Sequence, residues 1–142
     1  MTAGETILKL LEAFNRHDIA AFAAFYASDA VAYDPTYPDP LRGRDAIRRD
    51  MEQFFRAFPD VHCEVMGDVL DRGVQAAVRL RATGTHLGPL ATPQGEQPAT
   101  GRPVDFHVAI FWQVGEDDLI QSEHRYFDMA GIMAQLGLMP TP

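Results

Sequence analysis

The chain has 142 residues, of which 46% are hydrophobic and 23% charged, and its formal net charge at pH 7 is −8. This length and composition fit one globular domain, residues 1–142, built around one core. The acidic balance disfavours nucleic acid and anionic membrane surfaces as partners, because both repel negative charge and the arginines do not cluster into a basic patch.

Cysteine usage and the N-terminus indicate where the protein works. The single cysteine, Cys63, leaves no internal disulfide and fits a reducing cytoplasm. It lies beside His62 in an apolar, strand-like run, which favours a buried thiol over a nucleophile, and no second Cys/His pair completes a zinc motif. The N-terminus lacks a signal-peptide pattern, and no apolar run is long enough to cross a membrane, so we expect a soluble cytoplasmic protein.

The first half of the chain has helical periodicity. Apolar residues at helical spacing predict a helix over residues 5–18, capped by Thr2 or Thr6. Residues 17–30 predict a second, short helix with Asp18 as its N-cap. A brief strand over 30–35 leads into a proline-rich loop. A third helix spans 43–60 and ends at Pro59, with Asp50 among the acids that alternate with arginines on its solvated face.

The second half changes to strand patterns. Residues 61–73 and 74–88 predict a hairpin turning at 71–73, and 90–103 predict a loop rich in Gly, Pro and Thr. Residues 104–114 and 119–128 predict a second long hairpin, followed by a short helix from 129 that Asp128 caps. Helices first and antiparallel strands after predict an α+β fold, a curved antiparallel sheet wrapped around helices. Pockets in such folds lie between the concave sheet face and the helices.

The strand over 120–127 carries the polar groups that suggest chemistry. Because strand residues alternate faces, Glu123 and Arg125 share one face and lie close enough for a charge-assisted pair. Burying such a pair is costly, so a pocket and a plain rim salt bridge are the two explanations. His107 lies mid-strand among apolar residues; a hydrogen-bonded core position competes with a proton-transfer role on the same face.

A second group of candidate residues surrounds the first strand. Asp34 ends that strand before a proline, where it forms either an Asx turn or a carboxylate at a pocket mouth. Tyr33 and Tyr37 would supply aromatic walls there. We expect Phe54 and Phe111 to add apolar walls to the same pocket.

Neither strand of the last hairpin shows a clean polar face, so both sheet faces should be covered. One face would meet the helices and the other a second subunit, which predicts a homodimer through the sheet. The sequence contains no phosphate loop, nucleotide fingerprint, serine-hydrolase motif or metal-spaced motif.

Five segments, taken in chain order, resemble one known family. They are "LLEAFNRHDIAAFAAFYASDAVAYDP", "LRGRDAIRRDMEQFFRAFPD", "GTHLG", "ATGRPVDFH" and "YFDMAGIMAQLGL". Together they resemble the SnoaL-like polyketide cyclases of the nuclear transport factor two-like superfamily, with a cystatin-like cone. The resemblance implies a deep apolar pocket for a small-molecule ligand, a homodimer and no cofactor or metal.

The resemblance also implies a mechanism, from which this chain departs. Family cyclases close a ring by an intramolecular aldol reaction, with an aspartate on the last strand as acid/base and a histidine on the preceding strand assisting. Alignment on the shared "QLG" places Arg125 at the aspartate position and Ala109 at the histidine position, with His107 two residues earlier. An arginine cannot act as a general base near neutral pH, but it can bind a carboxylate or stabilise an oxyanion.

Three functions are consistent with these patterns. The first is a cofactor-independent cyclase or isomerase that moves a proton next to a carbonyl of a small apolar, oxygenated, polyketide-like substrate. Glu123 or His107 would be the base, Arg125 the oxyanion or carboxylate partner and Asp34 the second carboxylate. The second is a water-activating hydrolase or hydroxylase of the same fold. The third is a ligand-binding dimer without catalysis, in which Glu123 and Arg125 form a structural ion pair.

Overall fold

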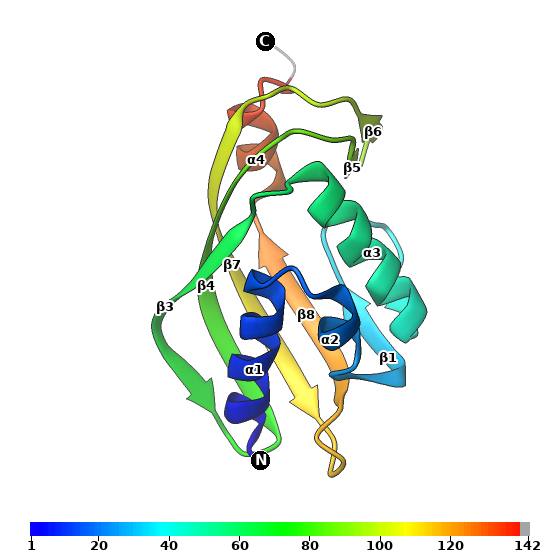
Figure 1. Ribbon diagram of the computed structural model, residues 1–142, viewed down its shortest axis with the longest axis vertical. Helices are drawn as coiled ribbons and strands as arrows, with labels where there is room; N and C mark the ends of the chain where they lie inside the picture. The colour runs from blue at the N-terminus through cyan, green and yellow to red at the C-terminus, as the bar shows by residue number, and fades with distance from the viewer. Residues whose placement is uncertain (140–142) are drawn as a thin grey trace.

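The computed structural model describes residues 1–139 and contains four helices among them. Helix α1 spans Ala3–Asn15, α2 spans Ile19–Ala23, α3 spans Arg44–Ala57 and α4 spans Met129–Gln135. Helices α1, α2 and α3 lie on one face of a large curved sheet, and α4 lies at one end of it (Figure 1). No helix in the described range is long and apolar enough to span a membrane.

The main sheet has six strands in the order β2-β1-β8-β7-β4-β3. Their bounds are β1 Tyr26–Tyr33, β2 Leu41–Arg42, β3 His62–Asp71, β4 Gln75–Thr85, β7 Pro103–Val114 and β8 Ile120–Phe127. All neighbours pair antiparallel except β1 and β8, which run parallel. The predicted α+β class and the sheet wrapped around helices are confirmed.

Helix caps follow the sequence signals closely. The side chain of Thr2 accepts from the backbone N–H of Glu5 and caps α1, and Asp18 and Asp128 cap α2 and α4 in the same way. The second helix is shorter than predicted: it ends at Ala23, and Tyr26 already begins β1. The aromatic residues of the predicted helix fit helical and strand patterns equally well. Pairing with β8 stabilises the strand conformation from Tyr26 onward.

The core lies between the concave sheet face and the helices. In β7, Val104 and Trp112 are buried while the residues at odd numbers between them turn to the other face. The buried stripe of α3, which includes Ile47, Met51 and Phe55, packs against this core. Tyr26 is fully buried at the centre, where burying an aromatic ring stabilises the fold strongly.

The segment predicted as a loop over 90–103 contains a small hairpin. Strands β5 (Leu90–Thr92) and β6 (Gly95–Gln97) form a separate two-stranded sheet near the C-terminal end of α3 (Figure 1). The chain enters it through Leu87 and Gly88, whose backbone N–H groups both donate to the carbonyl of Ala57. The prediction missed this hairpin because each strand has three residues, too few for a periodic pattern.

Gly88 is the close-approach point between the hairpin and α3. A Cβ atom there would lie 2.1 Å from the backbone oxygen of Arg56. We expect Gly88→Ala to lower the free energy of unfolding by about 1–3 kcal/mol, because backbone must shift to admit the methyl group. Urea unfolding measures this. Glu96→Ala on the exposed hairpin should stay within about 0.5 kcal/mol of wild type, and equal stability of both variants would contradict the packing described.

Candidate active site

A pocket opens between the concave face of the sheet and helices α1 and α3. Its empty volume is about 1090 Å³, which includes open solvent at its mouth. Most of its wall is apolar, and Phe54 lines it as predicted. Leu90 and Ala91 of the β5–β6 hairpin close part of the wall. Polar groups gather where β8, the end of β1 and α3 meet.

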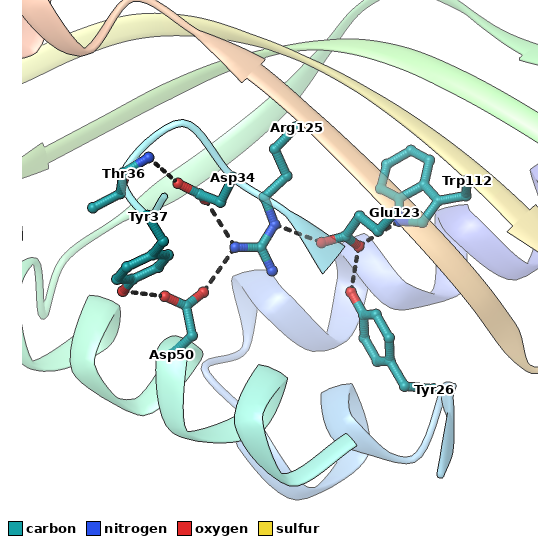
Figure 2. Close-up of polar contacts among 8 residues, drawn as sticks. All are labelled: Tyr26, Asp34, Thr36, Tyr37, Asp50, Trp112, Glu123 and Arg125. Atoms are coloured by element: carbon teal, nitrogen blue, oxygen red, sulfur yellow. Dashed lines mark hydrogen bonds and ion pairs between the residues drawn. The ribbon is translucent and has the colours of Figure 1, made fainter. Parts of the chain in front are cut away.

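Arg125 is the centre of this polar group. Its Nε donates to Glu123 Oε2 at 2.6 Å, and its Nη1 donates to Asp50 Oδ2 at 2.7 Å and to Asp34 Oδ2 at 3.0 Å (Figure 2). The four side chains are 4–12% exposed. The predicted pairing of Glu123 and Arg125 on one face of β8 is confirmed, and of the two explanations the pair lines the pocket and is not a rim salt bridge.

Glu123 is held from three sides. Besides the bond to Arg125, its Oε1 accepts from Tyr26 Oη at 2.5 Å and from Trp112 Nε1 at 2.5 Å. Trp112 is the direct cross-strand partner of Glu123 in the β7–β8 ladder, so the sheet register fixes this contact. A carboxylate that already accepts from three donors is well placed to orient Arg125 and has little capacity left to take a proton from a substrate.

The other two carboxylates each have one further donor. Asp50 Oδ1 accepts from Tyr37 Oη at 2.7 Å, and Asp34 Oδ1 accepts from the backbone N–H of Thr36 at 2.8 Å. The Thr36 bond is the Asx turn expected at Asp34, so this residue forms the turn and also lines the pocket. Tyr37 lines the pocket as predicted.

Burial and charge keep the donors of this cluster protonated. Burial lowers the pKa of Arg125, but Glu123, Asp50 and Asp34 together raise it by more, so its pKa lies well above the usual value. Burial, with the negative charge of Glu123, raises the pKa of Tyr26. Burial, with Asp50, raises the pKa of Tyr37. Both phenols therefore act as hydrogen-bond donors throughout the physiological pH range.

One nitrogen of the guanidinium remains free. Arg125 Nη2 is buried and has no hydrogen-bond partner among the described residues, and Figure 2 shows it without a contact beside Asp50 and Glu123. Buried donors without a partner are rare because each costs about 1–3 kcal/mol. A ligand oxygen in the pocket would remove that cost.

His107, Phe111 and Tyr33 lie on the other face of the sheet. His107 is exposed, while its neighbours Phe106 and Val108 line the pocket. Phe111 is 52% exposed and Tyr33 is 43% exposed, and neither lines the pocket. The prediction that these three residues share the pocket with Arg125 is wrong. Alternation separates the two faces of each strand correctly, but it does not give the register between strands. Trp112 of β7 pairs with Glu123, and this register decides which set of residues faces inward.

Three residues of the site were missed in sequence. Asp50 was assigned to the solvated face of α3, yet it follows Ile47 by three residues and precedes Phe54 by four, so it lies on the buried side of the helix. That spacing was a usable signal. In the sequence, Tyr26 and Trp112 have the pattern of ordinary core aromatic residues. Their role as hydrogen-bond donors follows only from the position of Glu123 in the structure.

The site offers oxygen and nitrogen groups but no assembled metal ligands. Within residues 1–139, no group of three or more His, Cys, Asp or Glu side chains is arranged to hold a metal ion. Cys63 lines the pocket, and burial raises the pKa of its thiol to about 12. At neutral pH it is therefore a protonated, weakly nucleophilic group, as expected for a core cysteine.

Comparison with known proteins now assigns the family. The family model described as SnoaL-like polyketide cyclase matches residues 5–136. The chain belongs to this family. Among curated proteins, none matches the chain. Membership supports a cyclase or isomerase type of function for this SnoaL-like chain and leaves its substrate open.

Solved structures share the fold along nearly the whole length. A putative SnoaL-like polyketide cyclase from Jannaschia sp. CCS1 has a TM-score of 0.83 at 18% identity, covering 97% of this chain and 93% of that one. IdmH, a putative polyketide cyclase from Streptomyces antibioticus, has a TM-score of 0.77 at 28% identity, covering 96% and 99%. AclR, a putative hydroxylase from Streptomyces galilaeus, has a TM-score of 0.79 at 22% identity, covering 99% and 83%.

Glu123 should be essential for stability. In Glu123→Gln the side-chain amide places N–H groups against donors that in the wild type bind a carboxylate. Arg125 also loses its partner on Nε. We expect a loss of about 3–5 kcal/mol in the free energy of unfolding, the usual effect of breaking a buried ion pair. Trp112→Phe, which removes one donor to Glu123, should lose about 1–3 kcal/mol.

Urea unfolding measures both losses. Glu64→Gln is the matched control, because Glu64 is a carboxylate on the same sheet whose 3.5 Å contact with Arg81 lies in solvent. A Glu123→Gln variant as stable as this control would show that the buried network contributes nothing to the fold.

Proposed function

We propose that this protein is a cofactor-independent, single-domain cyclase or isomerase that moves a proton next to a carbonyl of a small apolar, oxygenated substrate of polyketide type. The observation that supports this most strongly is the free Nη2 of Arg125 beside two pocket-lining carboxylates. A donor for a developing oxyanion and a proton acceptor within the same apolar pocket are the two groups that enolisation needs.

The proposed roles follow from the hydrogen bonds. A substrate carbonyl accepts from Arg125 Nη2, and Asp50 takes the proton from the adjacent carbon. Asp50 is favoured over Glu123, because Glu123 already accepts from three donors. It is favoured over Asp34 because it is the more exposed of the two, at 12% against 8%. Glu123 becomes a positioning residue that fixes the guanidinium.

The chemical step balances without any other reactant. The C–H bond next to the carbonyl breaks and its proton goes to a carboxylate oxygen of Asp50. The electron pair forms the C=C bond of an enolate, and the carbonyl π electrons move to the oxygen that Arg125 holds. Return of the proton to another carbon gives isomerisation. Attack of the enolate carbon on a second carbonyl of the same molecule gives ring closure, and the oxygen of that second carbonyl takes the proton back from Asp50 as a hydroxyl group.

Exchange of α-hydrogens tests this step without the natural substrate. The probe is 2-tetralone in D₂O, whose loss of α-protons is followed by NMR. We expect the wild-type protein to accelerate exchange above buffer, and Asp50→Asn to lower the protein-dependent rate by about 10²–10⁴-fold, the usual contribution of a general base.

The matched control is Glu52→Gln on the same helix. Glu52 is 43% exposed, pairs with Arg48 and does not line the pocket, so its loss removes the same charge without touching the site. Its rate should equal wild type. An Asp50→Asn variant with the wild-type rate would remove Asp50 from the mechanism.

A second candidate function is water addition, as in a hydrolase or hydroxylase. It is favoured by one observation: Asp34 and Asp50 both bind the same Nη1, which gives two carboxylates from which one could activate water and the other protonate a leaving oxygen. Styrene oxide in H₂¹⁸O separates the two functions. Labelled diol formed by the protein would favour water addition, and exchange of 2-tetralone without diol formation favours enolisation.

We further propose that the protein works as a cytoplasmic homodimer through the outer face of the sheet. Four aromatic rings gather there on β1, β8 and β7. Tyr33 stacks on His124 with ring centroids 4.3 Å apart, and Phe111 meets Tyr126 edge-on at 5.9 Å. This group contains no carboxylate, so two copies of a chain with net charge −8 can meet there without direct repulsion.

Light scattering tests the dimer. Wild type should have about twice the chain mass of 15.8 kDa, and Tyr126→Glu should shift it to the monomer mass, because the new carboxylate would meet its own copy across the interface. Leu70→Glu on the edge strand β3 is the control, since Leu70 is 64% exposed and lies outside the aromatic group. A wild-type monomer at working concentration would contradict the dimer.

A further inference from the structure

The charge of the Arg125 cluster limits which oxygen group can bind it. Three carboxylates surround one guanidinium, which leaves two surplus negative charges when all are ionised. Tyr26 and Tyr37 add no charge, because their pKa values are raised. Among residues 1–139, no other charged side chain lines the pocket.

This balance is unusual for an arginine that has a free donor. An arginine that recognises a carboxylate normally meets it with an unpaired charge and both terminal nitrogens. Here Nε and Nη1 are already occupied by acids, and Nη2 alone remains. An anionic ligand at Nη2 would gain one charge-assisted bond and face three carboxylates at short range in a poorly screened pocket.

We propose that Arg125 Nη2 binds a neutral carbonyl oxygen, that of a ketone or ester, and that the cluster excludes free carboxylic acids from the pocket. This inference rests on the proposed function and names its substrate class. The three carboxylates then determine ligand specificity and also hold the guanidinium in place.

The same balance permits the proposed reaction. Binding a carboxylate adds a negative charge to the cluster. Enolisation adds none, because the proton that reaches Asp50 neutralises that carboxylate as the charge appears on the substrate oxygen. The negative charge moves from the oxygen on Nη1 to the oxygen on Nη2, across one guanidinium. The site therefore tolerates the enolate intermediate while it rejects a permanent anion.

Two ligands of nearly the same shape test this selectivity. They are 2-acetylnaphthalene, a neutral ketone, and 2-naphthoate, its carboxylate counterpart, and calorimetric titration at pH 7.5 gives the dissociation constant of each. We expect wild type to bind the ketone at least about tenfold more tightly than the carboxylate, the effect of a surplus charge at short range in a medium of intermediate dielectric constant.

Variants locate the cause of the preference. Asp34→Asn and Asp50→Asn each remove one surplus negative charge. Each should therefore lower the ratio of the 2-naphthoate to the 2-acetylnaphthalene dissociation constant by about tenfold, through tighter binding of 2-naphthoate. Glu52→Gln makes the same change in net charge outside the pocket and should leave the preference at the wild-type value. Thermal unfolding of each variant confirms that it is folded before titration.

The results separate this proposal from the proposed reaction. Tighter or equal binding of 2-naphthoate by wild type, or binding of neither ligand, would overturn the charge selectivity. An unchanged preference in both aspartate variants would also overturn it. The ligands report binding without turnover, so a protein that prefers the ketone but does not exchange 2-tetralone would keep the selectivity and lose the reaction.

Discussion

The structure depends on one buried guanidinium and the carboxylates that neutralise it. Arg125 connects β8 to the loop after β1 through Asp34 and to α3 through Asp50. Glu123 extends the connection to β7 and to the start of β1. Burying four charged groups is expensive, and leaving any one of them unpaired is more so. The helix, the loop and the sheet are thereby held in one arrangement, and the pocket lies where they meet.

Under the proposed function, the same cluster takes the place of the acid/base that the family resemblance implies on the last strand. The resemblance implies Arg125 at that position, and an arginine does not exchange protons near neutral pH. In the proposed function the proton acceptor is instead Asp50 on α3, opposite the strand. The arginine becomes the electrophilic partner of the carbonyl. Glu123 binds its Nε, Asp34 and Asp50 bind its Nη1, and the two N–H groups of Nη2 remain for the substrate.

Sequence alone predicted the architecture well, because its signals are local. Caps at Thr2, Asp18 and Asp128 and the two long hairpins are encoded within short windows. That Glu123 and Arg125 share one face also followed from alternation. The face of His107 did not, because alternation sorts residues within a strand but the register between β7 and β8 decides which set faces inward. Asp50 illustrates a second limit, since an acid among arginines on an amphipathic helix resembles a surface residue until its partner is known.

The most direct test of this account is a crystal structure of the protein with 2-acetylnaphthalene bound. The ketone oxygen is expected within about 2.7–3.2 Å of Arg125 Nη2, with the methyl carbon turned toward the Asp50 carboxylate. A ketone bound elsewhere in the pocket, with Nη2 still unpaired or bonded to a protein group, would contradict the central role given to this nitrogen.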